Sequence, residues 1–384
     1  MFKLDYLNSH LSSGYSSLYT GRTLQLAGYS LIGLFLPIYL LIAFGQKIEQ
    51  VFYFFIVSDI LYIFFLPWGA QLLNKIGLRR SLRISVFLFS GFYISLMLLE
   101  TNFSVFLSLA LMTVVLGRVF FWLPFHTDLA RFTDVTNRGK AIGLLSATYI
   151  FLGVVMPIIS GFIISRYGYN LVFILVVTLY LCSFVPFLTL PSTHEKFSWS
   201  YLETIRQFFA KKNRKLVLSN MANGAENDIA VIIWPIFIWQ MFKGDFFAVG
   251  IISSLIILVA IVLQLFVGNY IDIHDKRKMM HWGSLLYAAG WFAKVFVFTP
   301  WQIFIVGTYH NFTGIFKDTP FETLNYELLA DKGHFVDEFT IIKEMAIWLG
   351  KALILLLSIF VVVNFGLNWT FALAALASLL INLF

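Results

Sequence analysis

Long apolar runs, each of about 20 residues, recur along the whole chain and limit what it can fold into. Runs of this length cross a bilayer as α-helices, whereas barrel strands alternate in polarity over about 10 residues. Only 12% of the residues are charged, against about 25% in soluble domains. We therefore predict an all-α polytopic membrane protein. Its twelve predicted spans are residues 17–44, 50–73, 80–99, 103–127, 140–164, 169–190, 215–242, 246–271, 279–299, 301–326, 338–364 and 367–384.

Basic residues are distributed unevenly between the two sides of this predicted bundle. Twelve spans place both termini on one side, and the loops of the opposite side carry only Lys47, Arg166 and Lys243 of the 27 lysine and arginine residues. Because cytoplasmic loops carry the basic excess, we predict cytoplasmic termini and a multi-pass protein of the cell membrane. The same bias explains most of the net charge of +7, so we expect no nucleic-acid partner.

Several functional classes are excluded by motifs that the sequence lacks. The single cysteine, Cys182, excludes an intramolecular disulfide and a cysteine metal cluster. Neither a Walker A motif nor a His-Glu-x-x-His motif occurs, and no Ser-His-Asp pattern stands out. We therefore expect neither an ATP-driven pump nor an enzyme, and no cofactor or metal. The first 17 residues are too polar for a cleavable signal peptide.

The two halves of the chain resemble each other at an offset of 196 to 198 residues. Four matches occur in chain order at this nearly constant spacing, which makes them more informative than any single one. They pair Pro37 with Pro235, residues 70–79 with 268–277, Pro124 with Pro320, and Gly153 with Gly350. A shift of six spans preserves orientation, so the halves are parallel repeats about an axis along the membrane normal, as in rocking two-domain transporters.

This repeat divides the chain into six-helix bundles at residues 1–190 and 215–384, joined by a linker at 191–214. In the linker, apolar residues recur at helical spacing opposite lysine and arginine, a pattern typical of a helix lying on the cytoplasmic membrane surface. A simple basic linker is the alternative. The apolar positions are Trp199, Leu202, Ile205 and Phe209.

The whole chain is similar to the major facilitator superfamily, whose loops after spans 2 and 8 carry Gly-x-Leu-Ala-Asp-Arg-x-Gly-Arg-Arg. Here these loops read A-Q-L-L-N-K-I-G-L-R-R at 70–80 and G-N-Y-I-D-I-H-D-K-R-K at 268–278. The resemblance implies a cytoplasmic latch in each half, in which a carboxylate pairs with arginine or a helix N-terminus. Asparagine replaces the first carboxylate, which should weaken that latch; a loop that only sets topology is the alternative. The latch candidates are Asn74, Gly77, Arg79, Gly268, Asp272 and Arg277.

One further family pattern is kept only in part. Drug exporters of the family carry Gly-x-x-x-Gly-Pro-x-x-Gly-Gly in span 5, and this chain keeps only Pro157 and Gly161 in register. An exporter of drugs or of several substrates is therefore one subtype that the resemblance suggests.

Span 7 carries the segment N-G-A-E-N-D-I-A-V at residues 223–231 inside an apolar run. On a helical wheel the amides Asn223 and Asn227 share one face, while Glu226 and Asp228 lie about 160° apart at its two edges. The two acids should therefore serve different partners. The repeat matches this face with a second polar stripe in span 1, which consists of Arg22, Gln25 and Tyr29. Because the family lines its central cavity with spans 1, 4, 7 and 10, the resemblance implies that both stripes face this cavity.

Spans 4 and 10 also carry charges where an ionisable group is costly and usually functional. Arg118, Trp122 and His126 share one face of span 4, and Arg118 is the best candidate for binding an anionic or polar group because it stays charged. The alternative is a permanent pair between Arg118 and Glu226, Asp228 or Asp318. We interpret His126 as a helix-end residue, with a proton relay as the alternative. The repeat places Asp318 and Glu322 of span 10 opposite Trp122 and His126.

Two charges lie in spans that pack between the halves in the family. We hypothesise that Asp59 of span 2, or a nearby acid, pairs with Lys351 of span 11 in one conformation and separates in another. Lys294 lies near the outer end of span 9, where it can snorkel to the interface, so it is left out of the site.

These features together predict a secondary active transporter that moves a small organic solute by alternating access, most simply by proton-coupled export. Low dielectric favours the protonated form of a carboxylate such as Glu226, so Glu226→Gln should lose coupling while still folding. The alternatives are uptake of a small metabolite or organic anion, a lipid or lysolipid flippase, and a receptor that does not transport. We expect H⁺ as coupling ion, a small molecule and the lipid bilayer as partners, and a monomer.

Overall fold

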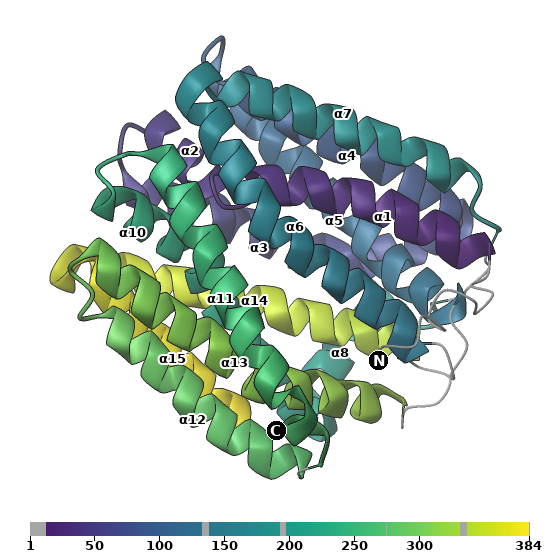
Figure 1. Ribbon diagram of the computed structural model, residues 1–384. Coiled ribbons are helices and arrows are strands. Elements are labelled where there is room, and N and C mark those ends of the chain that lie inside the picture. The colour runs from purple at the N-terminus through teal and green to yellow at the C-terminus, as the bar shows by residue number, and fades with distance from the viewer. Residues whose placement is uncertain (1–12, 133–137, 193–196, 274, 331–335, 384) are drawn as a thin grey trace, which may run out of the picture.

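The computed structural model describes residues 13–132, 138–192, 197–273, 275–330 and 336–383. Within these ranges the regular structure is helical and contains no strand, as the sequence predicts. The helices of the two halves form two groups that lie side by side in Figure 1, the first coloured purple to teal and the second green to yellow.

Each predicted span coincides with a helix or with a broken helix. The first half contains α1 (Ser13–Ile32), α2 (Leu36–Ala43), α3 (Ile48–Ile76), α4 (Leu78–Met97), α5 (Phe103–Phe132), α6 (Arg138–Tyr167) and α7 (Tyr169–Leu188). The linker contains α8 (Tyr201–Phe208) and the short turn η2 (Lys211–Asn213). The second half contains α9 (Arg214–Asp228), the π-helical turn η3 (Ile229–Ile233), α10 (Trp234–Met241), α11 (Phe246–Ile273), α12 (Lys276–Lys294), α13 (Pro300–Ala330), α14 (Val336–Phe365), η5 (Leu367–Trp369), α15 (Thr370–Leu380) and η6 (Ile381–Leu383).

The helices differ in how apolar they are. Six of the described helices are each long and apolar enough to cross a membrane, and seven are if the bent pair α1 and α2 is taken as one span. Of the remaining predicted spans, the last is apolar but shorter, at Leu367–Leu380, and the others are helical but carry more polar residues. They include α9 and α13, which hold the acids and amides that the sequence singles out.

The helices of both lead spans are distorted just before equivalent prolines of the repeat. α1 and α2 meet at an angle of 47° just before Pro37, and span 7 passes through the π-helical turn just before Pro235. Proline lacks a backbone N–H and its ring clashes with the carbonyl of the residue four positions earlier, so a helix bends or widens there. Pro37 and Pro235 thus each follow a distorted helical segment, which is a bend in span 1 and a π-helical turn in span 7.

Helix pairs from different halves hold the two groups together. α6 packs along α11, α3 along α14, and the short α2 contacts α10. The approach of α6 and α11 is close because glycines lie at the contact: a Cβ on Gly161 would lie 2.5 Å from the carbonyl oxygen of Phe246, and one on Gly250 would overlap that of Pro157. Pro157 and Gly161 are the two residues that match the drug-exporter pattern of span 5. Both therefore lie at the contact between the two halves.

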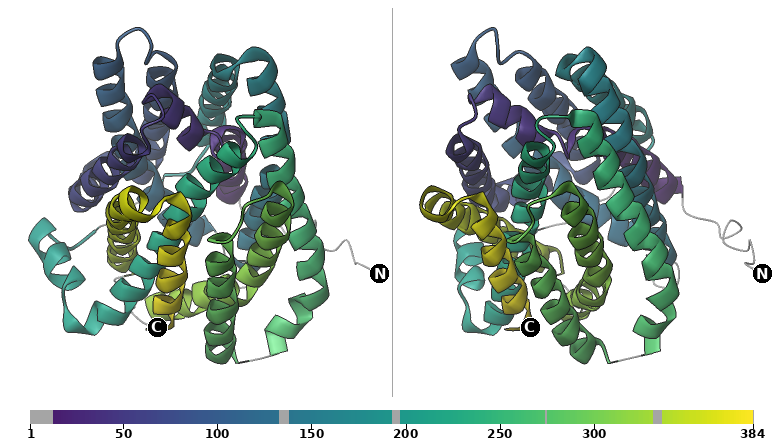
Figure 2. Two further views of the ribbon diagram at one scale, coloured as in Figure 1. Left: turned by 90° about the vertical axis from the view of Figure 1, so that its left-hand side faces the viewer. Right: turned by 60° about the vertical axis from the view of Figure 1, so that its left-hand side comes forward.

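The linker forms the short helix that its spacing suggests. The Ser200 side chain caps α8 by accepting a hydrogen bond from the backbone N–H of Glu203 at 3.2 Å. Leu202 and Phe209 are exposed, whereas the Trp199 ring packs on Phe339 with centroids 5.3 Å apart. Figure 2 shows α8 at the same end of the molecule as the C-terminus, and its attachment to the membrane surface stays a prediction.

Candidate functional site

Asp59 and Arg118 form an ion pair inside the first half. The carboxylate of Asp59 on α3 is buried and lies 3.2 Å from the guanidinium of Arg118 on α5. Arg118 also donates to the hydroxyl of Ser58 at 2.8 Å. The prediction that Arg118 binds an anion from solution therefore does not hold in this conformation, because the guanidinium is already neutralised by Asp59.

Asp228 and Lys351 form the corresponding pair inside the second half. Their side chains, on α9 and α14, are 3.0 Å apart and mostly buried. Asp59 and Lys351 are not paired in this conformation, because each has a nearer partner in its own half, and their pairing in another conformation stays a prediction. The two pairs are nevertheless neighbours, and Asp59 lies within electrostatic reach of both Asp228 and Lys351.

Trp348 on α14 connects these two ion pairs across the boundary between the halves. The Arg118 guanidinium lies 4.2 Å from the centroid of its indole, and the Lys351 ammonium lies 4.5 Å from it. The ring also packs edge-on against Tyr62 of α3 at 5.0 Å. A cation over an indole face is attracted by the ring quadrupole, so Trp348 stabilises the contact between α14 and the first half.

An exchange of charges tests this pairing. Asp228→Lys combined with Lys351→Asp is expected to recover the stability that each single variant loses, because the pair is re-formed with reversed signs. Asp59→Lys combined with Lys351→Asp should not recover stability, because the partner of Asp59 is Arg118. Thermal unfolding of the purified variants measures both, and equal recovery in the two double variants would contradict the assignment.

Glu226 takes part in a separate buried cluster of the second half. It pairs with Lys317 of α13 and accepts a hydrogen bond from the hydroxyl of Ser378 on α15. Lys317 also lies 3.0 Å from Asp318, whose side chain is 56% exposed. As the helical wheel predicts, Glu226 and Asp228 have different partners. The alternative that Arg118 pairs with Glu226, Asp228 or Asp318 is not observed in this conformation, because Arg118 pairs with Asp59.

Lys294 is buried rather than snorkelling to the membrane surface. Its ammonium lies 3.8 Å from the ring centroid of Trp291 and 4.3 Å from that of Trp234. Within the described part of the chain, no carboxylate lies within ion-pairing distance of it. Glu226 is close enough to act on it electrostatically, so Lys294 belongs to the same cluster.

Arg22 lies in the first half against an aromatic wall. Its guanidinium is 4.9 Å from the ring centroid of Phe121, 5.1 Å from that of Trp122 and 5.3 Å from that of Phe125. The Trp122 ring stacks in turn on His126 at 5.6 Å. In the described ranges Arg22 has neither an acidic partner nor a hydrogen bond, so its donors are available.

The other two residues of the span 1 stripe differ in exposure. Gln25 is buried, and neither its amide oxygen nor its nitrogen has a partner among the described residues. Tyr29 is exposed. The stripe therefore does not present one uniform surface, and Arg22 is its chemically distinctive member.

A cavity of about 220 Å³ lies between the two halves. Trp122 of α5 comes from the first half, and the other walls belong to α9 and α14. Asn223 and Asn227 line it, as the wheel for span 7 suggests. The complete lining is Trp122, Asn223, Gly224, Asn227, Glu344, Ile347, Trp348 and Lys351.

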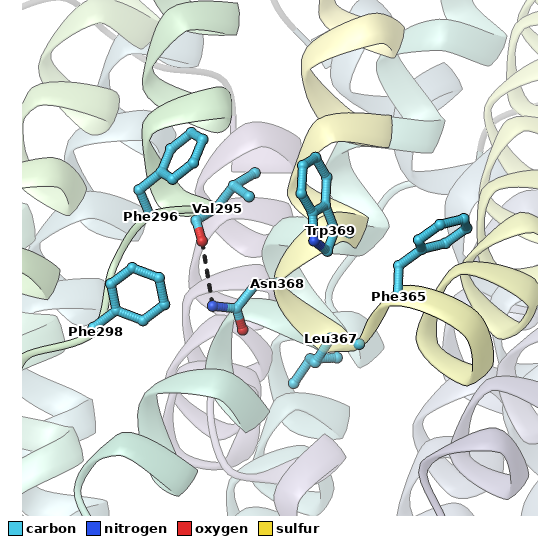
Figure 3. A pocket seen from close by; sticks show the side chains of 8 residues that line it. Val295, Phe296, Phe298, Phe365, Leu367, Asn368 and Trp369 are labelled. Atoms are coloured by element: carbon cyan, nitrogen blue, oxygen red, sulfur yellow. Dashed lines mark hydrogen bonds between the residues drawn. The ribbon is translucent and has the colours of Figure 1, made fainter.

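A second hollow, of about 280 Å³, lies between the end of α12 and η5. Figure 3 shows Phe296, Phe298, Phe365 and Trp369 around it, and Asn368 donates to the carbonyl of Val295 at 3.3 Å. No titratable side chain is among the residues that line it, and all of them come from the second half. Although it is larger, we place the site in the cavity between the halves, where residues of both halves and several charges meet.

Glu322 lies beside a lysine near the end of the bundle that is predicted to be cytoplasmic. Its carboxylate is 3.4 Å from the ammonium of Lys343 on α14. This contact links α13 to α14 within the second half and does not place Glu322 on the cavity wall.

The first latch loop contacts the linker. Asn74 donates to the backbone carbonyl of Phe197 and accepts from its N–H, both at 2.9 Å. Asparagine suits this double contact, because a carboxylate could not donate. Arg79 donates to the carbonyl of Leu190 at 3.1 Å, and Gly77 has a positive φ of 82°.

The second latch loop is only partly described. The side-chain positions of Gly268 and Asp272 lie outside the described residues. Arg277 is exposed at the start of α12, and Asp275 caps this helix by accepting from the N–H of Lys278 at 2.9 Å. The capping role explains an aspartate where the family pattern has glycine.

Glu344 and Trp348 are functional candidates that sequence reasoning missed. Together with Lys351 they follow one face of α14 at positions i, i+4 and i+7. That spacing was available in the sequence. Spacing alone does not show that this face of α14 lies against the cavity, because that depends on which helices pack there.

Comparisons with known proteins agree with this architecture. The chain is 22% identical over 348 residues to the uncharacterized protein YqgE of Bacillus subtilis (strain 168), covering 87% of this chain and 79% of that protein. Its fold matches the crystal structure of a D-xylose-proton symporter with a TM-score of 0.73 at 13% identity, covering 98% of this chain and 97% of that one. The family model of the Major Facilitator Superfamily matches residues 18–214 and 216–384. The chain therefore belongs to the Major Facilitator Superfamily, a family of membrane transporters.

Proposed function

We propose that this protein is a proton-coupled secondary transporter that moves a small organic anion by alternating access. The cavity between the halves supports this proposal, because a rocking carrier binds its substrate near the midplane at the interface of its repeats. The contacts of α2 with α10 and of α6 with α11 close the side that the charge bias assigns to the cell exterior. Access to the cavity in this state would then be from the cytoplasm.

The observation that carries the anionic substrate class is the state of Arg22. Its guanidinium has five N–H donors and stays protonated, and it finds no acceptor within the described ranges. Three aromatic rings surround it, and one of them, Trp122, also lines the cavity. A carboxylate or phosphate of a substrate would satisfy these donors in a bidentate manner, with its organic part against the aromatic wall.

Our proposal retains two predictions from the sequence, that transport is coupled to protons and that the substrate is exported. Glu226 is already held by Lys317 and Ser378, so its part in coupling requires that this pair opens during transport. The direction of net transport depends on the gradients of protons and substrate, and the experiment below determines it. Uptake of an organic anion is the alternative to export.

Counterflow in proteoliposomes tests the substrate class. Radiolabelled benzoate, lactate and citrate are the anionic probes, and glucose and tetraphenylphosphonium are the neutral and cationic comparators. We expect exchange of at least one anion and none of the comparators. Exchange of a comparator alone would contradict an anionic substrate, and the sign of a pH gradient that drives accumulation distinguishes export from uptake.

Arg22→Gln is expected to weaken binding of the exchanged anion by about 10- to 100-fold, because hydrogen bonds to a charged group contribute about 1.5–3 kcal/mol. Arg22→Lys should recover only part of this loss, since lysine lacks the planar fork. The matched control is Arg166→Gln, at an exposed position at the outer end of α6. Half-saturation in the counterflow assay measures the effect, and equal values for both glutamine variants would refute the role of Arg22.

A further inference from the structure

The cavity contains one carboxylate whose charge is not balanced by a neighbouring cation. Glu344 on α14 lines the cavity and is 9% exposed. It accepts a hydrogen bond from the indole N–H of Trp348 at 3.1 Å. Within the described ranges no lysine or arginine lies within ion-pairing distance of it.

The surrounding charges occur in pairs. Beside Glu344 on α14, Lys343 pairs with Glu322 of α13, and Lys351 pairs with Asp228 of α9. Lys343, Lys351 and Glu322 also act on Glu344 electrostatically.

The remaining helices packed on α14 carry two more ion pairs. α3 contributes Asp59 and the phenol of Tyr62, and α5 contributes Arg118, the partner of Asp59. On α8, Glu203 lies 3.9 Å from Arg206, while α15 and η5 carry no charged side chain. Among the residues that line the cavity, Glu344 is therefore the carboxylate that has no ion-pair partner within the described ranges.

We propose that Glu344 is the proton-binding residue of the transport cycle and that Trp348 passes its protonation state to the boundary between the halves. A buried charge without a partner is costly, and taking up a proton removes that cost. A cationic group of a substrate is the less suitable occupant, because the indole of Trp348 already contacts Arg118 and Lys351.

The position of Trp348 provides the connection to the conformational change. Its N–H is held by the Glu344 carboxylate, and its ring contacts Tyr62 and Arg118 of the other half. A hydrogen bond to an ionised acceptor is about twice as strong as one between neutral groups. Protonation of Glu344 therefore weakens the hydrogen bond that it accepts from the indole N–H of Trp348. The contact between α14 and the first half is weakened as a result.

The first test needs no substrate. Tryptophan emission of the purified full chain is titrated against pH, and the curve of Trp348→Phe is subtracted to isolate Trp348. We expect the difference between the two emission curves to show a single transition with pH. When both proteins also carry Glu344→Gln, the difference curve should show no transition. A flat difference curve, or the same transition in the Glu344→Gln background, would overturn the proposal.

The second test rests on the proposed function and uses the labelled anion that the wild type exchanges best among benzoate, lactate and citrate. Glu344→Gln should lose accumulation driven by a pH gradient and keep counterflow, which needs no net proton movement. The control is Glu100→Gln, at an exposed position after α4. Persisting gradient-driven accumulation in Glu344→Gln, or loss of its counterflow as well, contradicts proton binding by Glu344. Absence of counterflow in the wild type instead refutes the proposed function and leaves the emission test to decide on Glu344.

Discussion

Lys317→Met is expected to destabilise the protein by about 3–5 kcal/mol, the cost of removing one partner of a buried ion pair. Lys317 is 1% exposed and neutralises Glu226, which is equally enclosed in the second half. Without the ammonium, Glu226 keeps only the hydroxyl of Ser378 as a partner of its carboxylate. Asp318 loses the same ammonium but is more exposed, so water can compensate it.

Thermal unfolding of the purified variants measures this loss. Adding Glu226→Gln to Lys317→Met should recover most of it, because the unbalanced charge is then removed as well. Lys75→Met, at an exposed position near the end of α3, is the matched control. If Lys317→Met unfolds no earlier than this control, Glu226 does not depend on Lys317.

Gly350→Ala should also destabilise strongly, although it adds only one methyl group. The new Cβ would overlap the carbonyl of Met221 on α9, and a Cβ on Gly224 would likewise overlap the carbonyl of Ile347 on α14. Because backbone atoms form this contact, the helices must separate, and overpacking of this kind costs about 1–3 kcal/mol or more. The separation would also pull Asp228 away from Lys351.

The control for this substitution is Gly143→Ala on α6, where a Cβ meets nothing within 4 Å. Alanine is the better helix former, so this control should be neutral or slightly stabilising. Unfolding temperature measures both variants. A Gly350→Ala variant as stable as Gly143→Ala would show that α9 and α14 pack less closely than described.

The helices could be predicted from the sequence because the physical signal lies within each segment. A run long enough to cross a bilayer must satisfy its backbone hydrogen bonds internally, which a helix does. The offset that pairs Pro37 with Pro235 likewise needed no structure, and a bend or a π-helical turn precedes each of these positions. The separation of Glu226 from Asp228 followed from helix periodicity alone.

The partners of the charged residues could not be predicted in the same way. Periodicity gives the face on which Asp59 lies but not the neighbouring helix, and α3 contacts both α5 and α14. In this structure Asp59 therefore pairs with Arg118 and not with Lys351. The pairing of Lys317 with Glu226 could not be predicted either, because adjacent residues of a helix point in different directions and the sequence does not show which of them faces α9.

The breaks at Pro37 and Pro235 have a mechanical consequence for the outer entrance. Beyond each break lies a helix of only eight residues, α2 or α10, and the two contact each other there. Neither proline can donate a backbone hydrogen bond to the preceding turn, so each short helix joins its long helix with one backbone hydrogen bond fewer. We therefore expect the outer entrance to widen by bending of these two short helices, which displaces less lipid than movement of a whole bundle would.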